Sequence, residues 1–130
     1  MNTWQYIKLV LTGVVPYILF FLSPIKWLMI GVGVLTFIDL VTGIYAANKR
    51  EKITSQKLAR TVAKVMWFQV AILLSRMFEI IFVPGIPVAK ITAGYIGLTE
   101  FKSNMENISE ATGIDIWNYI IDEFNKMKGK

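Results

Sequence analysis

Four long runs of apolar residues dominate the chain, and short polar or turn-forming segments separate them. The runs cover residues 5–22, 25–47, 65–83 and 86–101. The first three are about as long as an α-helix must be to cross a hydrocarbon core of about 30 Å. A chain of 130 residues has no soluble core that could bury so many apolar helices. The pattern therefore predicts an all-α, small multi-span helical membrane protein, with one membrane domain over residues 1–130.

Turn-forming residues mark the ends of these helices. Ser23-Pro24 and the segment 84–87 are short enough to predict antiparallel returns, and Pro16 predicts a kink in the first helix. Ser55 is a favourable N-cap for a helix that continues to Val83, with its first turns in water or among the headgroups. The run 86–101 is short, so it is either a span or an interfacial segment. We expect four transmembrane helices.

The composition becomes that of a soluble segment in residues 102–130. Ser103 and Glu106 fit a capping box, and Gly113 fits a helix stop. The apolar residues that follow share one helical face. They are Ile114, Trp117, Ile120, Ile121, Phe124 and Met127. This tail predicts a C-terminal amphipathic helix that lies on the membrane surface or packs against another chain.

Basic residues are concentrated in one segment. The chain has 14 Lys and Arg against 9 Asp and Glu, for a net charge of +5. Six of the basic residues lie in residues 48–64: Lys49, Arg50, Lys52, Lys57, Arg60 and Lys64. Short loops rich in Lys and Arg face the cytoplasm. We therefore expect this basic loop and the N-terminus to be cytoplasmic.

The remaining composition argues against catalysis. The sequence contains no Cys and no His, which excludes the usual zinc sites, thiol catalysis and His-based acid–base chemistry. Its acidic residues do not pair at a plausible site, and no Gly-rich loop follows a strand. No alternation of basic and aromatic residues suggests nucleic acid. The expectation is a protein that is not an enzyme, with no cofactor, no metal and no nucleic-acid partner.

Three ionisable residues, Asp39, Arg76 and Glu79, lie deep in the predicted spans. Ionisable groups are costly inside a membrane, so they indicate function. Arg76 and Glu79 are three residues apart and can pair. Counted from the cytoplasmic helix ends, Asp39 and Arg76 differ in depth by less than one turn, which predicts an interhelical bond. This intramembrane polar seam is either a structural ion pair or the lining of water in an assembled pore.

Small residues recur at four-residue spacing in two of the helices. Ala89, Ala93 and Gly97 form a stripe in the fourth run, and Gly43 and Ala47 form a pair in the second. Such spacing lets two helix backbones approach closely in lipid. We expect the stripe that begins at Ala89 to be a contact between two copies of the chain.

Two stretches resemble the phage holin family, in the group of toxin-secretion and phage-lysis holins. The first is a membrane Asp followed by a Gly, a basic loop, a Ser and a Lys. The second has the spacing Glu-x-x-Ser-x-x-Glu-Asn with a trailing Gly, and it is the more specific of the two. The matching residues are Asp39, Gly43, Ser55, Lys64, Glu100, Ser103, Glu106, Asn107 and Gly113.

The resemblance implies a multi-pass protein of the bacterial inner membrane that is not an enzyme. Such a protein oligomerises into pores or lesions that let a cell-wall hydrolase or a toxin cross the membrane. The implied partners are the lipid bilayer, further copies of the chain, and a functional link to a peptidoglycan hydrolase or toxin. Two alternatives stay open: a non-pore membrane scaffold or anchor subunit, and a small channel or transporter with Asp39 and Glu79 as a relay.

Overall fold

Helices make up all the regular structure of the described residues. The computed structural model describes residues 1–47 and 55–129. Its elements are α1 (Thr3–Leu9), a π-helical segment η1 (Val10–Val14), α2 (Val15–Leu22), α3 (Lys26–Ala47), α4 (Ser55–Phe82), α5 (Val88–Thr112) and α6 (Ile116–Lys128). The all-α prediction is confirmed. The predictions for Lys49, Arg50 and Lys52 fall on residues 48–54, which lie outside the described residues.

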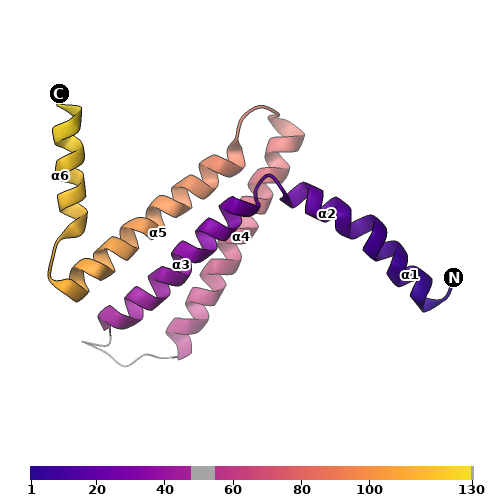
Figure 1. Ribbon diagram of the computed structural model, residues 1–130, viewed down its shortest axis with the longest axis horizontal. Coiled ribbons are helices and arrows are strands. Elements are labelled where there is room, and N and C mark those ends of the chain that lie inside the picture. The colour runs from indigo at the N-terminus through magenta and orange to yellow at the C-terminus, as the bar shows by residue number, and fades with distance from the viewer. Residues whose placement is uncertain (48–54, 130) are drawn as a thin grey trace.

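Helices α3, α4 and α5 lie side by side and form a three-helix bundle (Figure 1). Helix α5 is parallel to α3, because Gly97 approaches Leu35 and Asn107 approaches Gly43 further along both helices. Helix α4 runs antiparallel to both. The buried apolar core of the bundle consists of Ile25, Val32, Ile72, Ala89, Ala93 and Ile96. This bundle fixes the positions of all the polar groups described below.

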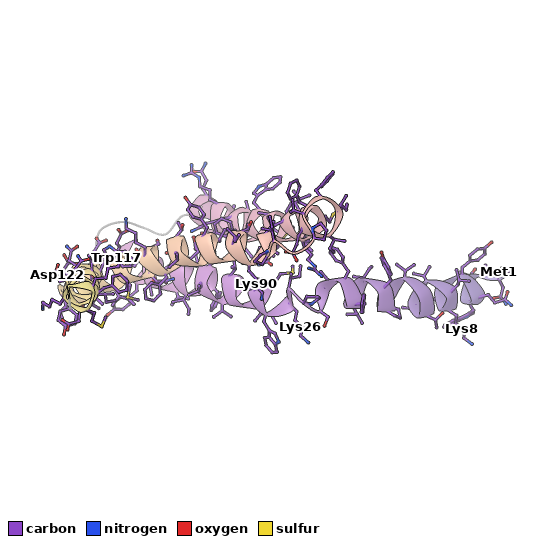
Figure 2. The ribbon with its side chains drawn as sticks, turned by 90° about the horizontal axis from the view of Figure 1, so that it is seen from above. Met1, Lys8, Lys26, Lys90, Trp117 and Asp122 are labelled. Atoms are coloured by element: carbon purple, nitrogen blue, oxygen red, sulfur yellow. The ribbon has the colours of Figure 1, made fainter. Side chains whose placement is uncertain are left out.

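The first three elements form a helical arm, residues 3–22, that extends away from the bundle (Figures 1 and 2). No residue of the arm is buried. Segment η1 ends directly before the turn that contains Pro16, where the proline ring removes a backbone donor. The disturbance expected at Pro16 therefore takes the form of a π-helical segment. The arm presents apolar side chains to its surroundings over its whole length.

Helix α5 is longer than the fourth apolar run predicts. It continues without a break to Thr112, so Ser103 and Glu106 lie inside a helix and not at the start of one. The predicted capping box is wrong, because the Ser103 hydroxyl donates to Asp39 on α3 and caps no backbone N–H. The predicted stop is confirmed: Gly113 has a left-handed φ of 74° and ends the helix.

Within the described residues, three helical stretches are long and apolar enough to cross a membrane. They are Thr3–Leu22, Lys26–Ala47 and Leu58–Phe82. Helix α5 is not among them, so the fourth span stays a prediction. Its position parallel to α3 nevertheless takes it through the same depth as a helix that is apolar enough to span.

Helix α6 turns away from the end of α5 (Figure 1). Asp115 caps it by accepting from the backbone N–H of Asn118 at 3.1 Å. The ring of Trp117 packs edge-on against Phe101 of α5, with 6.4 Å between the ring centres. The C-terminal helix therefore exists as expected and begins at Ile116, two residues after the predicted start.

Candidate functional site

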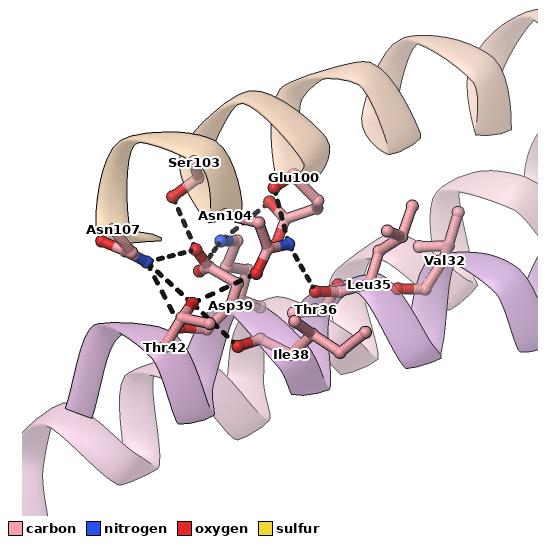
Figure 3. Close-up of polar contacts among 11 residues, drawn as sticks. Val32, Leu35, Thr36, Ile38, Asp39, Thr42, Glu100, Ser103, Asn104 and Asn107 are labelled. Carbon is pink, nitrogen blue, oxygen red and sulfur yellow. Dashed lines mark hydrogen bonds and ion pairs between the residues drawn. The ribbon is translucent and has the colours of Figure 1, made fainter. Parts of the chain in front are cut away.

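A cluster of polar side chains lies inside the bundle where α3, α4 and α5 meet (Figure 3). We call it the polar cluster, and it consists of Asp39, Thr42, Lys64, Glu100, Ser103, Asn104 and Asn107. Its members come from segments that are 25 to 68 positions apart in the sequence. Folding therefore converts scattered polar residues of three apolar helices into one site.

Asp39 of α3 has a donor for each carboxylate oxygen. Its Oδ1 accepts from the Ser103 hydroxyl at 2.6 Å and from the Asn107 amide at 3.1 Å. Its Oδ2 accepts from Lys64 Nζ at 3.2 Å. Donors to a carboxylate offset the cost of removing the charge from water. Asp39 is thus a fully partnered carboxylate that ties α3 to both neighbouring helices.

Glu100 of α5 is the most deeply buried charged residue of the polar cluster, with 1% of its surface exposed. Its Oε1 lies 2.8 Å from Lys64 Nζ, whereas its Oε2 is buried and has no hydrogen-bond partner. Lys64 therefore bridges Glu100 and Asp39. With both acids ionised, one cation serves two carboxylates, so the site depends strongly on Lys64.

Two amide side chains connect α5 to α3. Asn104 donates to the backbone carbonyl of Leu35 at 3.0 Å and accepts from the Thr42 hydroxyl at 3.2 Å. Asn107 donates to the same hydroxyl at 3.2 Å. Satisfied polar groups between helices fix one relative position of those helices. These contacts fix the depth of α5 along α3.

A cavity of about 300 Å³ adjoins the polar cluster toward the end of α3. Asp39, Gly43, Ala47, Thr61 and Asn107 are among the residues that line it. A Cβ atom at Gly43 would lie 3.5 Å from the Asn107 amide nitrogen, an ordinary contact distance. The predicted small pair therefore lies beside this cavity, next to the polar cluster.

A second polar group lies further along α4. Arg76 forms an ion pair with Glu79, and Glu79 Oε2 accepts from the backbone N–H of Ala89 at 3.2 Å. The predicted Asp39–Arg76 bond is wrong, because Asp39 pairs with Lys64 instead. The depth count set Val65, the start of the third apolar run, level with Ala47, whereas the observed ion pair sets Lys64 level with Asp39, eight residues before Ala47. Arg76 consequently lies twelve residues, or about 18 Å, beyond the level of Lys64.

The stripe of small residues on α5 packs against other helices of the same chain. Ala89 and Ala93 are 1% and 4% exposed and belong to the core of the bundle. Gly97 lies against the Leu35 side chain of α3, since a Cβ atom added to the glycine would lie 3.7 Å from Leu35 Cδ1. The expected contact between copies at this stripe is therefore wrong, because these residues are already covered by α3 and α4.

The structure brings most of the family signature residues together and leaves others apart. Glu106 is exposed and pairs with Lys102 at 3.6 Å, and Ser55 is exposed at the first described turn of α4. Thr42 and Asn104 belong to the polar cluster but were not singled out from the sequence. Their spacing was the available signal, since each follows an acidic residue of the same helix by one turn.

One of three comparisons with known proteins finds a match. No curated protein and no solved structure matches the chain. A family model described as the bacteriophage holin family matches residues 17–129. The match includes the bundle, the polar cluster and α6. The chain therefore belongs to the bacteriophage holin family.

Proposed function

We propose that the protein assembles in the bacterial inner membrane into pores or lesions through which a cell-wall hydrolase or a toxin crosses. Membership of the holin family supports this function. One structural observation supports it further: charged side chains are exposed on the outer face of α5, which runs parallel to α3.

The charged outer face of α5 is formed by Lys102 and Glu106, whose side chains are 53% and 59% exposed. Their depth follows from the next residue, Asn107, which bonds Asp39 and lies beside Gly43. Those two residues precede the end of α3 by eight and four positions, or about 12 and 6 Å. If α3 spans the membrane, these charges therefore lie within the bilayer.

Charges in contact with lipid are unfavourable. On insertion scales an acidic or basic residue at the helix centre costs about 2.5–3.5 kcal/mol, and the cost is smaller nearer the interface. An assembly that turns this face of α5 toward water hydrates both charges. The arm and the outer face of α4 carry mainly apolar side chains, which suit them to face lipid. We therefore place α5 at the water-filled interior of the assembly.

The basic loop determines the orientation that we propose for the helices in the membrane. With that loop and the N-terminus in the cytoplasm, α3 and α5 both run from the outer to the inner side, and α4 returns outward. The polar cluster then belongs to the cytoplasmic half of the bundle.

Asp39 and Glu79 pair with different cations, Lys64 and Arg76, which gives no support to a relay between the two acids in a channel or transporter.

Single cysteines test this proposal directly, because the natural chain has none. Glu106→Cys is compared with Val41→Cys, which lies on α3 at a similar depth and is 49% exposed. Cells producing each variant are treated with a membrane-impermeant maleimide while the membrane potential is recorded. We expect strong labelling at position 106 after depolarisation and little at position 41, since thiols react as thiolates in water.

Two results would argue against the proposal. Equal, weak labelling at both positions in depolarised cells would show that α5 faces lipid like α3. Cells that accumulate the protein and keep their membrane potential would favour the scaffold function, in which the chain anchors other proteins and opens no path.

A further inference from the structure

Helix α6 has an apolar face that the other described residues cover only in its first turn. Trp117 packs against Phe101 of α5. The later apolar residues of the same face remain exposed, with 51% of Phe124 and 64% of Met127 accessible. Ile120 and Ile121 are exposed beside them. Asn118, Asp122 and Lys126 fall on the opposite side of the helix, which makes α6 amphipathic.

The contacts between α5 and α3 set the depth at which α6 begins. Asn107 of α5 bonds the hydroxyl of Thr42 on α3, so these two residues lie at one level. Five residues further along each of these parallel helices, α5 ends at Thr112 and α3 ends at Ala47. Each step covers about 7.5 Å, so the two helices end at the same level. The left-handed Gly113 then turns the chain there.

Where α3 crosses the membrane, that level coincides with a boundary of the bilayer. Helix α3 has 22 residues and is about 33 Å long, close to a hydrocarbon thickness of about 30 Å. A helix that starts at the end of α3 therefore starts at the headgroups. Surface helices bury their apolar face by about 5–10 Å at the boundary between headgroups and acyl chains. The depth of α6 thus favours a lipid surface as the partner of its apolar face.

The charges of α6 show what would drive this contact. The helix carries two acids, Asp122 and Glu123, and two bases, Lys126 and Lys128, so its side-chain charges cancel. Lys126 lies 3.3 Å from Glu123. Lys128 Nζ lies 5.3 Å from the centre of the Phe124 ring. At a membrane surface, a lysine beside an apolar face can keep its alkyl chain along that face and extend its ammonium to the headgroups. Apolar burial, and not attraction to anionic lipid, is the driving force.

We infer that α6 is a membrane-surface helix that inserts its apolar face into the leaflet at which α3 ends. Phe124 and Met127 enter the acyl boundary, and Asp122 and Lys126 face water. The inference requires only that α3 crosses the membrane, and it holds whether or not the protein forms pores.

The test uses the full-length protein in phosphatidylcholine vesicles, with and without phosphatidylglycerol. An environment-sensitive fluorophore is attached to Phe124→Cys or, as a matched control on the adjacent polar side, to Asn125→Cys. A quencher attached to the upper acyl chain should reduce emission at position 124 several-fold more than at position 125. An aqueous quencher should show the opposite order, and phosphatidylglycerol should change neither order.

A second variant separates lipid contact from a folding defect. The fluorophore at Ile121→Cys should move into water when Phe124→Asp is added and should stay in lipid when Asn125→Asp is added. Equal accessibility of positions 124 and 125 to the aqueous quencher would overturn the inference. So would a fluorophore at position 124 that neither quencher reaches and whose shielding grows with the protein-to-lipid ratio, since that result places α6 against a second copy.

Discussion

Replacement of Lys64 by Met is the sharpest perturbation of the bundle. Lys64 Nζ lies 2.8 Å from Glu100 and 3.2 Å from Asp39, so one substitution removes both ion pairs of the polar cluster. Met has a similar length and is apolar, which preserves much of the packing. Asp39 keeps the Ser103 and Asn107 donors. Glu100 loses its cation and is 1% exposed, so most of the loss of stability comes from its buried, unpaired charge.

The size of the effect follows from that uncompensated charge. Polar contacts between membrane helices average about 0.6 kcal/mol and reach about 1.7 kcal/mol. Removal of one partner of a buried ion pair costs about 3–5 kcal/mol, because the other charge remains buried. The second case applies to Glu100, so we expect Lys64→Met to lower the free energy of unfolding by about 3–5 kcal/mol. Addition of Glu100→Gln removes the stranded charge and should recover a large part of the loss.

The assay is reversible unfolding in mixed detergent micelles, followed by tryptophan fluorescence. Lys126→Met is the control, because it breaks an exposed i,i+3 pair with Glu123 on α6 and should cost about 0.3–0.5 kcal/mol. If Lys64→Met is no more harmful than Lys126→Met, the polar cluster does not hold the three helices together. A double variant, Lys64→Met with Glu100→Gln, that is as unstable as the single one would also refute the reasoning.

Three further outcomes follow from the packing. Ala93→Leu should lower the unfolding free energy by about 1–3 kcal/mol through overpacking, because Ala93 is 4% exposed in the bundle core; an unchanged unfolding midpoint would place it outside the core. Arg76→Gln and Asp39→Asn should have additive effects on the free energy of unfolding, because the two residues belong to separate polar groups. A coupling energy of ~1 kcal/mol or more, which is typical of residues in contact, would show that Arg76 and Asp39 interact. Gly113→Ala should lower the free energy of unfolding by about 1 kcal/mol, because Gly113 has a left-handed φ of 74°. Gly94 has open space around it, so Gly94→Ala should be neutral or stabilising in the same unfolding titration.

The sequence was sufficient for features that depend on local chemistry. Apolar runs located the helices, and the glycine at position 113 stopped α5 with its left-handed backbone. The family signature residues also pointed to the right region, since Asp39, Lys64, Glu100 and Ser103 meet in the polar cluster. These predictions succeeded because helix periodicity and glycine conformation need no knowledge of neighbouring helices.

Features that depend on the relative position of two helices were not predictable in the same way. The true partner of Asp39 is Lys64 and not Arg76, because the depth of α4 relative to α3 decides which residues reach the level of Asp39, and Lys64 lies at that level. Continuation of α5 past Phe101 likewise depends on α3, which supplies partners for Ser103 and Asn107. A polar segment that resembles an exposed tail in sequence thereby becomes part of the bundle.

The most direct test of the proposed function is the membrane potential of bacterial cells that produce the protein together with a peptidoglycan hydrolase confined to the cytoplasm. A potential-sensitive dye reports depolarisation, and loss of culture turbidity reports that the hydrolase has crossed. We predict a period of normal potential while the protein accumulates, followed by abrupt depolarisation and lysis. Heavy accumulation of membrane-inserted, cross-linkable protein with an intact potential and no lysis would contradict pore or lesion formation.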